Sequence, residues 1–126
     1  MARGNLWIVL TKDSREKLLA FIPPFYPHIF ADHVTLFYNV ELIEEYKSLL
    51  GAKVEIILKE NIFNHKIQAT TLDIGELPCQ NTSPHITISA QEGIKPFESN
   101  SMLESDHTSV PVEKTIIEGI VEFKEF

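Results

Sequence analysis

Two copies of one four-residue pattern constrain this chain more than any other feature of its sequence. The pattern reads histidine, aliphatic, threonine, aliphatic, and it occupies residues His33–Leu36 and His85–Ile88. β-Branched residues recur in both copies and favour strands, in which successive side chains point to opposite faces of a sheet. Each copy therefore predicts a strand that turns a histidine and a threonine to one face and an aliphatic pair to the core. The expected core residues are Val34, Leu36, Ile86 and Ile88.

The composition predicts a single globular domain over residues 1–126. Hydrophobic residues make up 44% of the chain and charged residues 23%, which is typical of a sequence that folds on its own. The 11 Lys and Arg residues against 18 Asp and Glu residues give a net charge of −7, which repels a long phosphate backbone. We therefore expect a short nucleotide or one strand end as the ligand, and no long duplex.

The cysteine count and the apolar runs bear on the compartment. Cys79 is the only cysteine, so an intrachain disulfide is impossible and the chain suits a reducing environment. The apolar run Leu6–Leu10 is too short for a signal-peptide core or a membrane span, and charged residues follow it closely. We expect a cytoplasmic protein that has no contact with membranes.

Local patterns predict the mixture of strands and helices found in an α+β protein. Helices are expected from a cap at Asp13 or Ser14 to about Phe21, before two prolines, and over Glu41–Leu50. Residues 94–105 are either a weak helix or a loop. The expected strands are Leu6–Leu10, His33–Val40, Lys53–Leu58, Lys66–Ile74, His85–Ala90 and Lys114–Phe126, the last with Gly119 as a candidate bulge.

The repeated pattern also carries a chemical prediction. Pairing two such strands would line a cleft with two imidazoles and two hydroxyls. Phosphodiester hydrolysis needs one neutral imidazole to take a proton from water and one protonated imidazole to give a proton to the departing oxygen, and histidine reaches both states near neutral pH. Threonine hydroxyls can bond the phosphate oxygens on which charge builds up.

These two motifs resemble those of the 2H phosphoesterases, a superfamily that includes bacterial 2′-5′ RNA ligase-like proteins, cyclic phosphodiesterases and the cyclic phosphodiesterase part of fungal tRNA ligases. The resemblance implies a bilobal α+β fold, in which two pseudo-twofold-related lobes of antiparallel sheet with flanking helices surround a central groove. It implies that His33 and His85 are the catalytic acid and base, in either order, and that Thr35 and Thr87 bind the substrate phosphate. It also implies catalysis without a metal or another cofactor.

Several other residues are candidates for parts of the site. Aromatic side chains near the first motif could stack a nucleobase, although core packing is the commoner role of such residues. The aromatic candidates are Phe25, Tyr26, Phe37 and Tyr38. Isolated basic residues, Arg15, Lys66 and Lys95, could each contact a phosphate. A zinc site on His28, His33 and Asp32 matches no common ligand spacing. The chain has neither a serine nucleophile elbow nor a glycine-rich phosphate loop.

Three functions fit these motifs. The first is hydrolysis of 2′,3′-cyclic phosphate ends of RNA or nucleotides by two-histidine acid–base catalysis, in the context of RNA repair. The second is degradation of a small signalling nucleotide, 2′,5′-linked or cyclic, which suits the acidic net charge. The third is a non-catalytic module that only binds a phosphorylated nucleotide.

Overall fold

The structure is a computed structural model that describes residues 2–126, and strands dominate it. The three helices of this range are α1 (Lys12–Phe21), α2 (Glu44–Lys47) and α3 (Glu98–Leu103). Its strands are β1 (Arg3–Leu10), β2 (His28–Ile29), β3 (His33–Glu41), β4 (Lys53–Phe63), β5 (Ile67–Asp73), β6 (His85–Ala90), β7 (Thr108–Pro111) and β8 (Ile116–Glu125). The expected antiparallel sheet is confirmed, and only these three short helices accompany it in residues 2–126.

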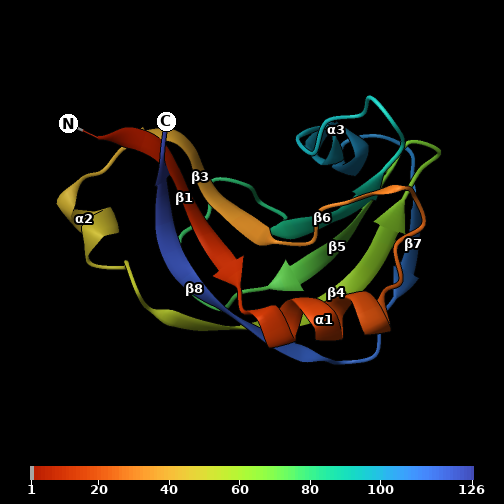
Figure 1. The fold of residues 1–126 in the computed structure, drawn as a ribbon, viewed down its shortest axis with the longest axis horizontal. Helices are drawn as coiled ribbons and strands as arrows, with labels where there is room; N and C mark the ends of the chain where they lie inside the picture. Colours follow the sequence, from red (N-terminus) through yellow and green to blue (C-terminus); the bar gives the residue numbers. More distant parts are fainter. Residues whose placement is uncertain (1) are drawn as a thin grey trace.

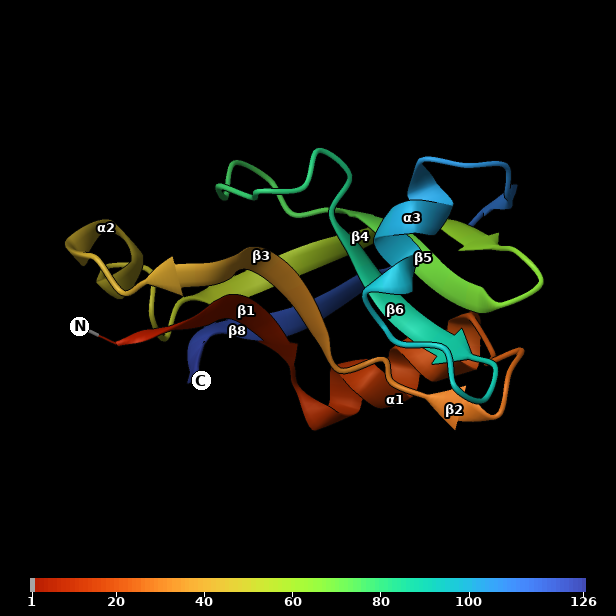
Figure 2. The same ribbon diagram turned by 90° about the horizontal axis from the view of Figure 1, so that it is seen from above.

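All strand pairs are antiparallel and belong to one sheet. Its order is β2-β6-β5-β4-β8-β1-β3, and β7 pairs with β4 beside this path. The sheet curls strongly, so that β3 and β6, which lie near opposite ends of the strand order, come close to each other (Figures 1 and 2). Both ends of the described chain lie at one end of the molecule, where the amide of Phe126 donates to the carbonyl of Arg3.

The curled sheet encloses the main hydrophobic core. The inward side chains alternate along the strands, as in β1, where Leu6, Ile8 and Leu10 are buried and the residues between them are partly exposed. The four aliphatic residues of the repeated pattern, Val34, Leu36, Ile86 and Ile88, are fully buried in this core, which confirms the predicted faces.

Helices α1 and α3 cover different parts of the sheet (Figure 2). Leu18 of α1 joins the main core, and the Ser14 hydroxyl accepts a hydrogen bond from the amide of Glu118 in β8. Met102 of α3 joins a second, smaller cluster with residues of β4, β5 and β6, including Ile62 and Ala90. Helix α3 therefore forms a cover over the β5–β6 side of the sheet.

The first helix begins and ends close to its expected bounds, but its cap differs. Thr11 is the N-cap, because its hydroxyl accepts from the amide of Ser14, so the expectation of a cap at Asp13 or Ser14 is wrong. The helix ends where the sequence predicts, since the following prolines cannot continue the hydrogen-bond ladder.

The second expected helix is reduced to the single turn α2. Its intended first residues belong to the sheet instead: Glu41 pairs with Arg3 of β1, and the amide of Leu42 donates to the carbonyl of Ala2. Gly51, with φ of +82°, turns the chain into β4. Pairing across the sheet therefore overrides the helical spacing of the apolar residues in this segment.

Gly119 does not mark a bulge. It pairs regularly with Leu10 of β1 and with Val54 of β4. A Cβ atom at this position would lie 2.5 Å from Cγ2 of Ile8 and 2.8 Å from the carbonyl oxygen of Val9. Glycine is needed here because the neighbouring strand approaches closely, not because the strand is irregular.

Candidate active site

The two histidine motifs are joined by direct hydrogen bonds between their chain segments. In the short strand β2, His28 pairs with Ala90 and Ile29 with Ser89 of β6. The same antiparallel contact continues past β2, because the amide of Ala31 donates to the carbonyl of Thr87 at 2.9 Å. His33 follows Ala31 by two residues, and His85 precedes Thr87 by two residues. His33 and His85 therefore each lie within two residues of the hydrogen bond that joins the two segments.

The loop that precedes the second motif lies along the free edge of the first. The amide of Gln80 donates to the carbonyl of Leu36 at 2.7 Å, and the Gln80 side chain accepts from the amide of Tyr38 at 3.0 Å. Cys79 Sγ donates to the carbonyl of Thr35 at 3.6 Å, and partial burial raises the pKa of this free thiol. The segment before the first motif is thus bonded to β6, and the loop before the second motif is bonded to β3.

His33 is held by a carboxylate on one edge and by an aromatic ring on one face. Nδ1 of His33 lies 2.7 Å from Oδ1 of Asp32. This hydrogen bond, more than any other contact, holds the pKa of the Asp32 carboxyl below its ordinary value of 3.8. The indole of Trp7 stacks on the imidazole, with ring centroids 3.9 Å apart and planes at 17°. The His33 side chain remains 26% exposed.

Strand pairing places Trp7 beside His33. In the register of β1 against β3, Val9 lies opposite His33 and Trp7 lies opposite Thr35, so the indole is a diagonal neighbour of the imidazole. The sequence analysis missed Trp7, since nothing local in the sequence fixes the register between strands about 25 residues apart. The position of Asp32 directly before His33 is the sequence signal for its contact with the imidazole, whereas the sequence hypothesis for Asp32 was a metal ligand.

His85 lies deeper than His33, and both of its ring nitrogens have partners. Nδ1 lies 2.9 Å from the carbonyl oxygen of Ser83, and Nε2 lies 3.0 Å from Oγ of Ser99 in α3. Burial is the main cause that lowers the pKa of His85 below its ordinary value of 6.5; the Ser83 carbonyl raises it, and the charge of His33 lowers it further. Strands β3 and β6, which carry the two histidines, are in contact with each other.

The two threonines differ in their surroundings. The Thr87 hydroxyl lies 3.0 Å from Oγ of Ser99 and donates to the carbonyl of Pro96 at 3.2 Å. The Thr35 hydroxyl makes no hydrogen bond within residues 2–126, and Thr35 is half-buried on the same side of β3 as His33. The first motif is therefore open, whereas the α3 region covers the second. No sequence pattern indicated Ser99, which lies in a weakly patterned segment.

The aromatic residues singled out by sequence lie in varied surroundings. Phe37 packs on Tyr46 against the core, and Phe25 packs edge-on against Phe63. Tyr38 is 62% exposed, and its ring lies edge-on to that of Phe126. The amides of Phe25 and Tyr26 both donate to the Ser89 hydroxyl, and these bonds hold the loop between α1 and β2 on β6.

Of the basic candidates, Arg15 is linked to the site through Asp32. Its guanidinium donates to the carbonyl of Phe30 at 3.0 Å, and its charge contributes to the lowered pKa of Asp32. Lys66 is an exposed residue in the turn between β4 and β5, and Lys95 is an exposed residue before α3. For the zinc hypothesis, His28 is exposed on β2 and Asp32 is engaged by His33. Residues 2–126 contain no group of three or more His, Cys, Asp or Glu side chains placed to hold a metal ion.

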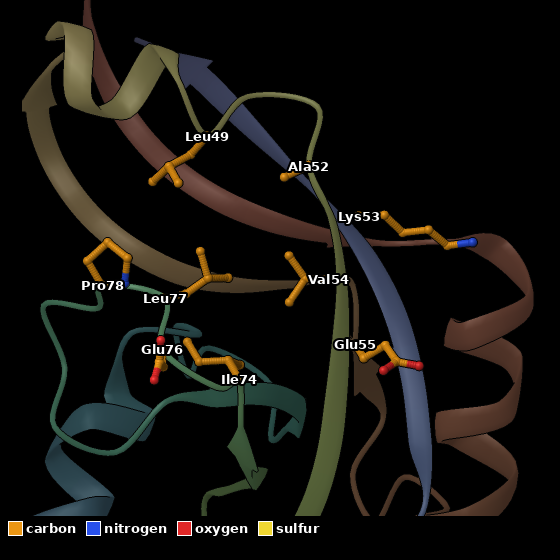
Figure 3. Close-up of a pocket in the computed structure, with 9 residues that line it drawn as sticks. All are labelled: Leu49, Ala52, Lys53, Val54, Glu55, Ile74, Glu76, Leu77 and Pro78. Atoms are coloured by element: carbon orange, nitrogen blue, oxygen red, sulfur yellow. The ribbon is translucent and has the colours of Figure 1, made fainter.

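Two surface hollows lie apart from the histidines. One, of about 470 Å³, has an apolar floor that includes Leu49, Val54 and Leu77, and the acidic Glu55 and Glu76 flank it (Figure 3). The other, of about 420 Å³, lies between the β4–β5 turn and α3, and its lining includes the charged or titratable residues His65, Lys66, Glu98 and Asp106. Neither hollow is lined by a residue of the two motifs. In the described part of the chain, no helix has the length and apolar character needed to span a membrane.

Comparison with known proteins gives the family. The model of the fungal tRNA ligase phosphodiesterase domain matches residues 27–125, which include both histidine motifs. A solved structure described as a fungal RNA kinase has the same fold, with a TM-score of 0.61 and 18% sequence identity; the match covers 99% of this chain and 44% of that one. This chain therefore spans less than half the length of that structure. No curated protein matches the sequence significantly. The chain belongs to the family of fungal tRNA ligase phosphodiesterase domains.

Proposed function

We propose that this domain hydrolyses 2′,3′-cyclic phosphate ends of RNA or nucleotides by two-histidine acid–base catalysis, without a metal. The main observation behind the proposal is the hydrogen bond between the amide of Ala31 and the carbonyl of Thr87. It joins the two chain segments within two residues of His33 and of His85. A phosphate between His33 and His85 would then have one imidazole for the attacking water and one for the leaving oxygen.

The partners at Nδ1 support different roles for the two histidines. The Ser83 carbonyl can only accept, so Nδ1 of His85 carries the proton and a neutral His85 presents a bare Nε2, as a general base requires. The buried surroundings of His85 also favour this neutral form. The Asp32 carboxylate accepts from Nδ1 of His33 and orients this imidazole, which leaves Nε2 to give a proton to the leaving oxygen as the general acid.

The proposed step balances as follows. Water adds to phosphorus and gives a proton to Nε2 of His85, while the bond from phosphorus to one ribose oxygen breaks and that oxygen takes the proton from His33. The product is a phosphomonoester beside a free hydroxyl. Thr35 and Thr87 would donate hydrogen bonds to the non-bridging oxygens as negative charge builds up on them.

Several finer features belong to the same proposal. The match to a tRNA ligase domain favours an RNA end as the substrate over a small signalling nucleotide, and the net charge of −7 fits a ligand no longer than a strand end.

We also propose that residues 1–126 are one domain with a cytoplasmic location. In its architecture, the β6-β5-β4 and β8-β1-β3 parts of the sheet would be the two pseudo-twofold-related lobes, with the site between β3 and β6.

Turnover in excess chelator tests the proposal. The chain is incubated with 2′,3′-cyclic mononucleotides and with an oligonucleotide that ends in a cyclic phosphate, and products are separated by thin-layer chromatography. We expect hydrolysis that chelator does not change, with a bell-shaped dependence of kcat/KM on pH whose two limbs belong to the coupled histidine pair. Activity that needs a divalent ion, or that rises steadily with pH, would instead indicate a metal-bound hydroxide.

The alternative with a specific observation in its favour is a binding module. Both working groups of the second motif, Nε2 of His85 and the Thr87 hydroxyl, are hydrogen-bonded inside the protein. A module would bind the cyclic nucleotide, measurable by calorimetry, and return it unchanged in the same incubation.

A further inference from the structure

One buried hydroxyl outside the two motifs touches both functional side chains of the second motif. Ser99 is only 1% exposed. Its Oγ lies 3.0 Å from Nε2 of His85, 3.0 Å from Oγ1 of Thr87 and 2.9 Å from the carbonyl oxygen of Pro96. Such a centre can serve as donor to one partner and as acceptor from another at the same time.

The distribution of protons in this cluster depends on the state of His85. When His85 is neutral, its bare Nε2 accepts from the Ser99 hydroxyl, and Thr87 can donate to the Pro96 carbonyl. When His85 is protonated, Nε2–H donates to Ser99 Oγ, and the single proton of Ser99 turns to the Pro96 carbonyl. Both states are fully hydrogen-bonded without any movement of the heavy atoms.

Helix α3 holds Ser99 firmly in this place. Met102, one turn further along α3, is 1% exposed and packs with Ile62, Ile67 and Ala90. Moving the helix away would expose this buried apolar side chain to water, which opposes the movement. A rotation of the Ser99 side chain costs far less than a movement of the helix. The contact between Ser99 and His85 is therefore present in the free protein.

We infer that Ser99 is a positioning residue of the catalytic centre, which holds the His85 imidazole and the Thr87 hydroxyl in the resting site and releases Nε2 when its side chain turns away toward Pro96. This inference rests on the proposed function. Because Nε2 has a single lone pair, the attacking water takes the place of Ser99 Oγ in front of Nε2 during proton transfer, and Ser99 Oγ accepts from Nε2–H again when the product has left. His33 is the other titrating group that acts on His85, and Asp32 bonds to His33 on its opposite edge.

The test compares Ser99→Ala with Ser101→Ala, the same substitution at an exposed position of the same helix. The kinetic readout is kcat/KM for a 2′,3′-cyclic mononucleotide as a function of pH. The second readout is NMR of the ¹⁵N-labelled imidazoles without substrate, which reports the tautomer and the titration of His85. We expect Ser99→Ala to lower kcat/KM about tenfold, mainly through kcat, because one hydrogen bond that orients the base is lost.

The titration gives a readout that a purely structural role would not move. The bond from a charged Nε2–H to Ser99 Oγ is stronger than the bond to neutral Nε2, so its loss should lower the pKa of His85 further and move the ascending limb to lower pH. Ser101→Ala should match the wild type in both readouts.

Three results decide the matter. Unchanged rates and an unchanged His85 titration in Ser99→Ala would overturn the inference, and so would an increased kcat/KM, which would make Ser99 an obstruction that substrate must displace. If the wild type hydrolyses no cyclic phosphate, the proposed function fails, while the NMR titration still decides whether Ser99 holds His85.

Discussion

At the scale of single residues, the proposed chemistry depends on His33 and His85 more than on the two threonines. Replacing either histidine with alanine should lower turnover about 10²-fold or more, because each variant lacks one proton-transfer partner. Thr35→Ala or Thr87→Ala should raise the activation free energy by about 1–3 kcal/mol through one lost hydrogen bond. Steady-state assays of the four variants check this ranking.

His65→Ala is the matched control for the histidine variants, because His65 is exposed in the β4–β5 turn, away from both motifs. It should retain wild-type turnover. Each catalytic variant should also keep a cooperative urea transition, which shows that the lost activity is not lost folding. Wild-type rates in both histidine variants would refute acid–base catalysis by this pair.

Trp7 is the residue whose contribution is least visible in the sequence. Its stack on His33 should fix the imidazole plane, and aromatic contacts of this kind contribute about 0.5–1.5 kcal/mol. We therefore expect Trp7→Leu to lower kcat/KM by about two- to tenfold, and Trp7→Phe, which keeps an aromatic face, to lower it less. Equal losses in both variants would mean that the stack has no part in catalysis.

Because Trp7 is the only tryptophan, its fluorescence offers a second measurement. Emission from an indole stacked on an imidazole should change when that imidazole gains a proton. The change should disappear in His33→Ala and remain in His85→Ala. This comparison separates the stack itself from its effect on the reaction.

At the scale of structural elements, the close approach of β1 and β8 depends on Gly119. Gly119→Ala would place a methyl group against Ile8 and the Val9 carbonyl, so we expect a loss of about 1–3 kcal/mol in the free energy of unfolding. Urea unfolding measures it. Lys124→Ala, an exposed change on the same strand, should stay within about 0.5 kcal/mol of the wild type. Equal stability of the two variants would contradict the close approach.

At the scale of the whole molecule, His85 should make stability depend on pH. Its pKa is lower in the folded state than the ordinary value of 6.5, so between these two values the unfolded chain binds more protons than the folded one. The contribution is present above pH 6.5 and is lost as the pH falls through the folded pKa. Asp32, also lowered, acts in the same direction, but only below its ordinary value of 3.8.

Urea transitions at pH 8 and pH 5.5 test this linkage. The wild type and His65→Gln, an exposed-site control, should lose stability at the lower pH, and His85→Gln should lose less. An equal loss in all three proteins would show that burial of His85 does not govern the acid side of the stability profile.

The sequence by itself determined which residues of each motif are buried and which face away, because side-chain alternation is a local property of a strand. It also determined the end of α1 and the full extent of β6, where prolines and β-branched residues act over a few positions. The family resemblance stated from the two motifs was confirmed by the match to the tRNA ligase phosphodiesterase domain.

Only the tertiary structure decided what surrounds the histidines. Trp7 reaches His33 through the register of β1 on β3, and Ser99 reaches His85 because Met102 anchors α3 on β5 and β6. The same long-range pairing drew Glu41 into the sheet and shortened the expected second helix. Contacts between residues far apart in the chain depend on strand register and helix packing, and no periodicity within a short window encodes them.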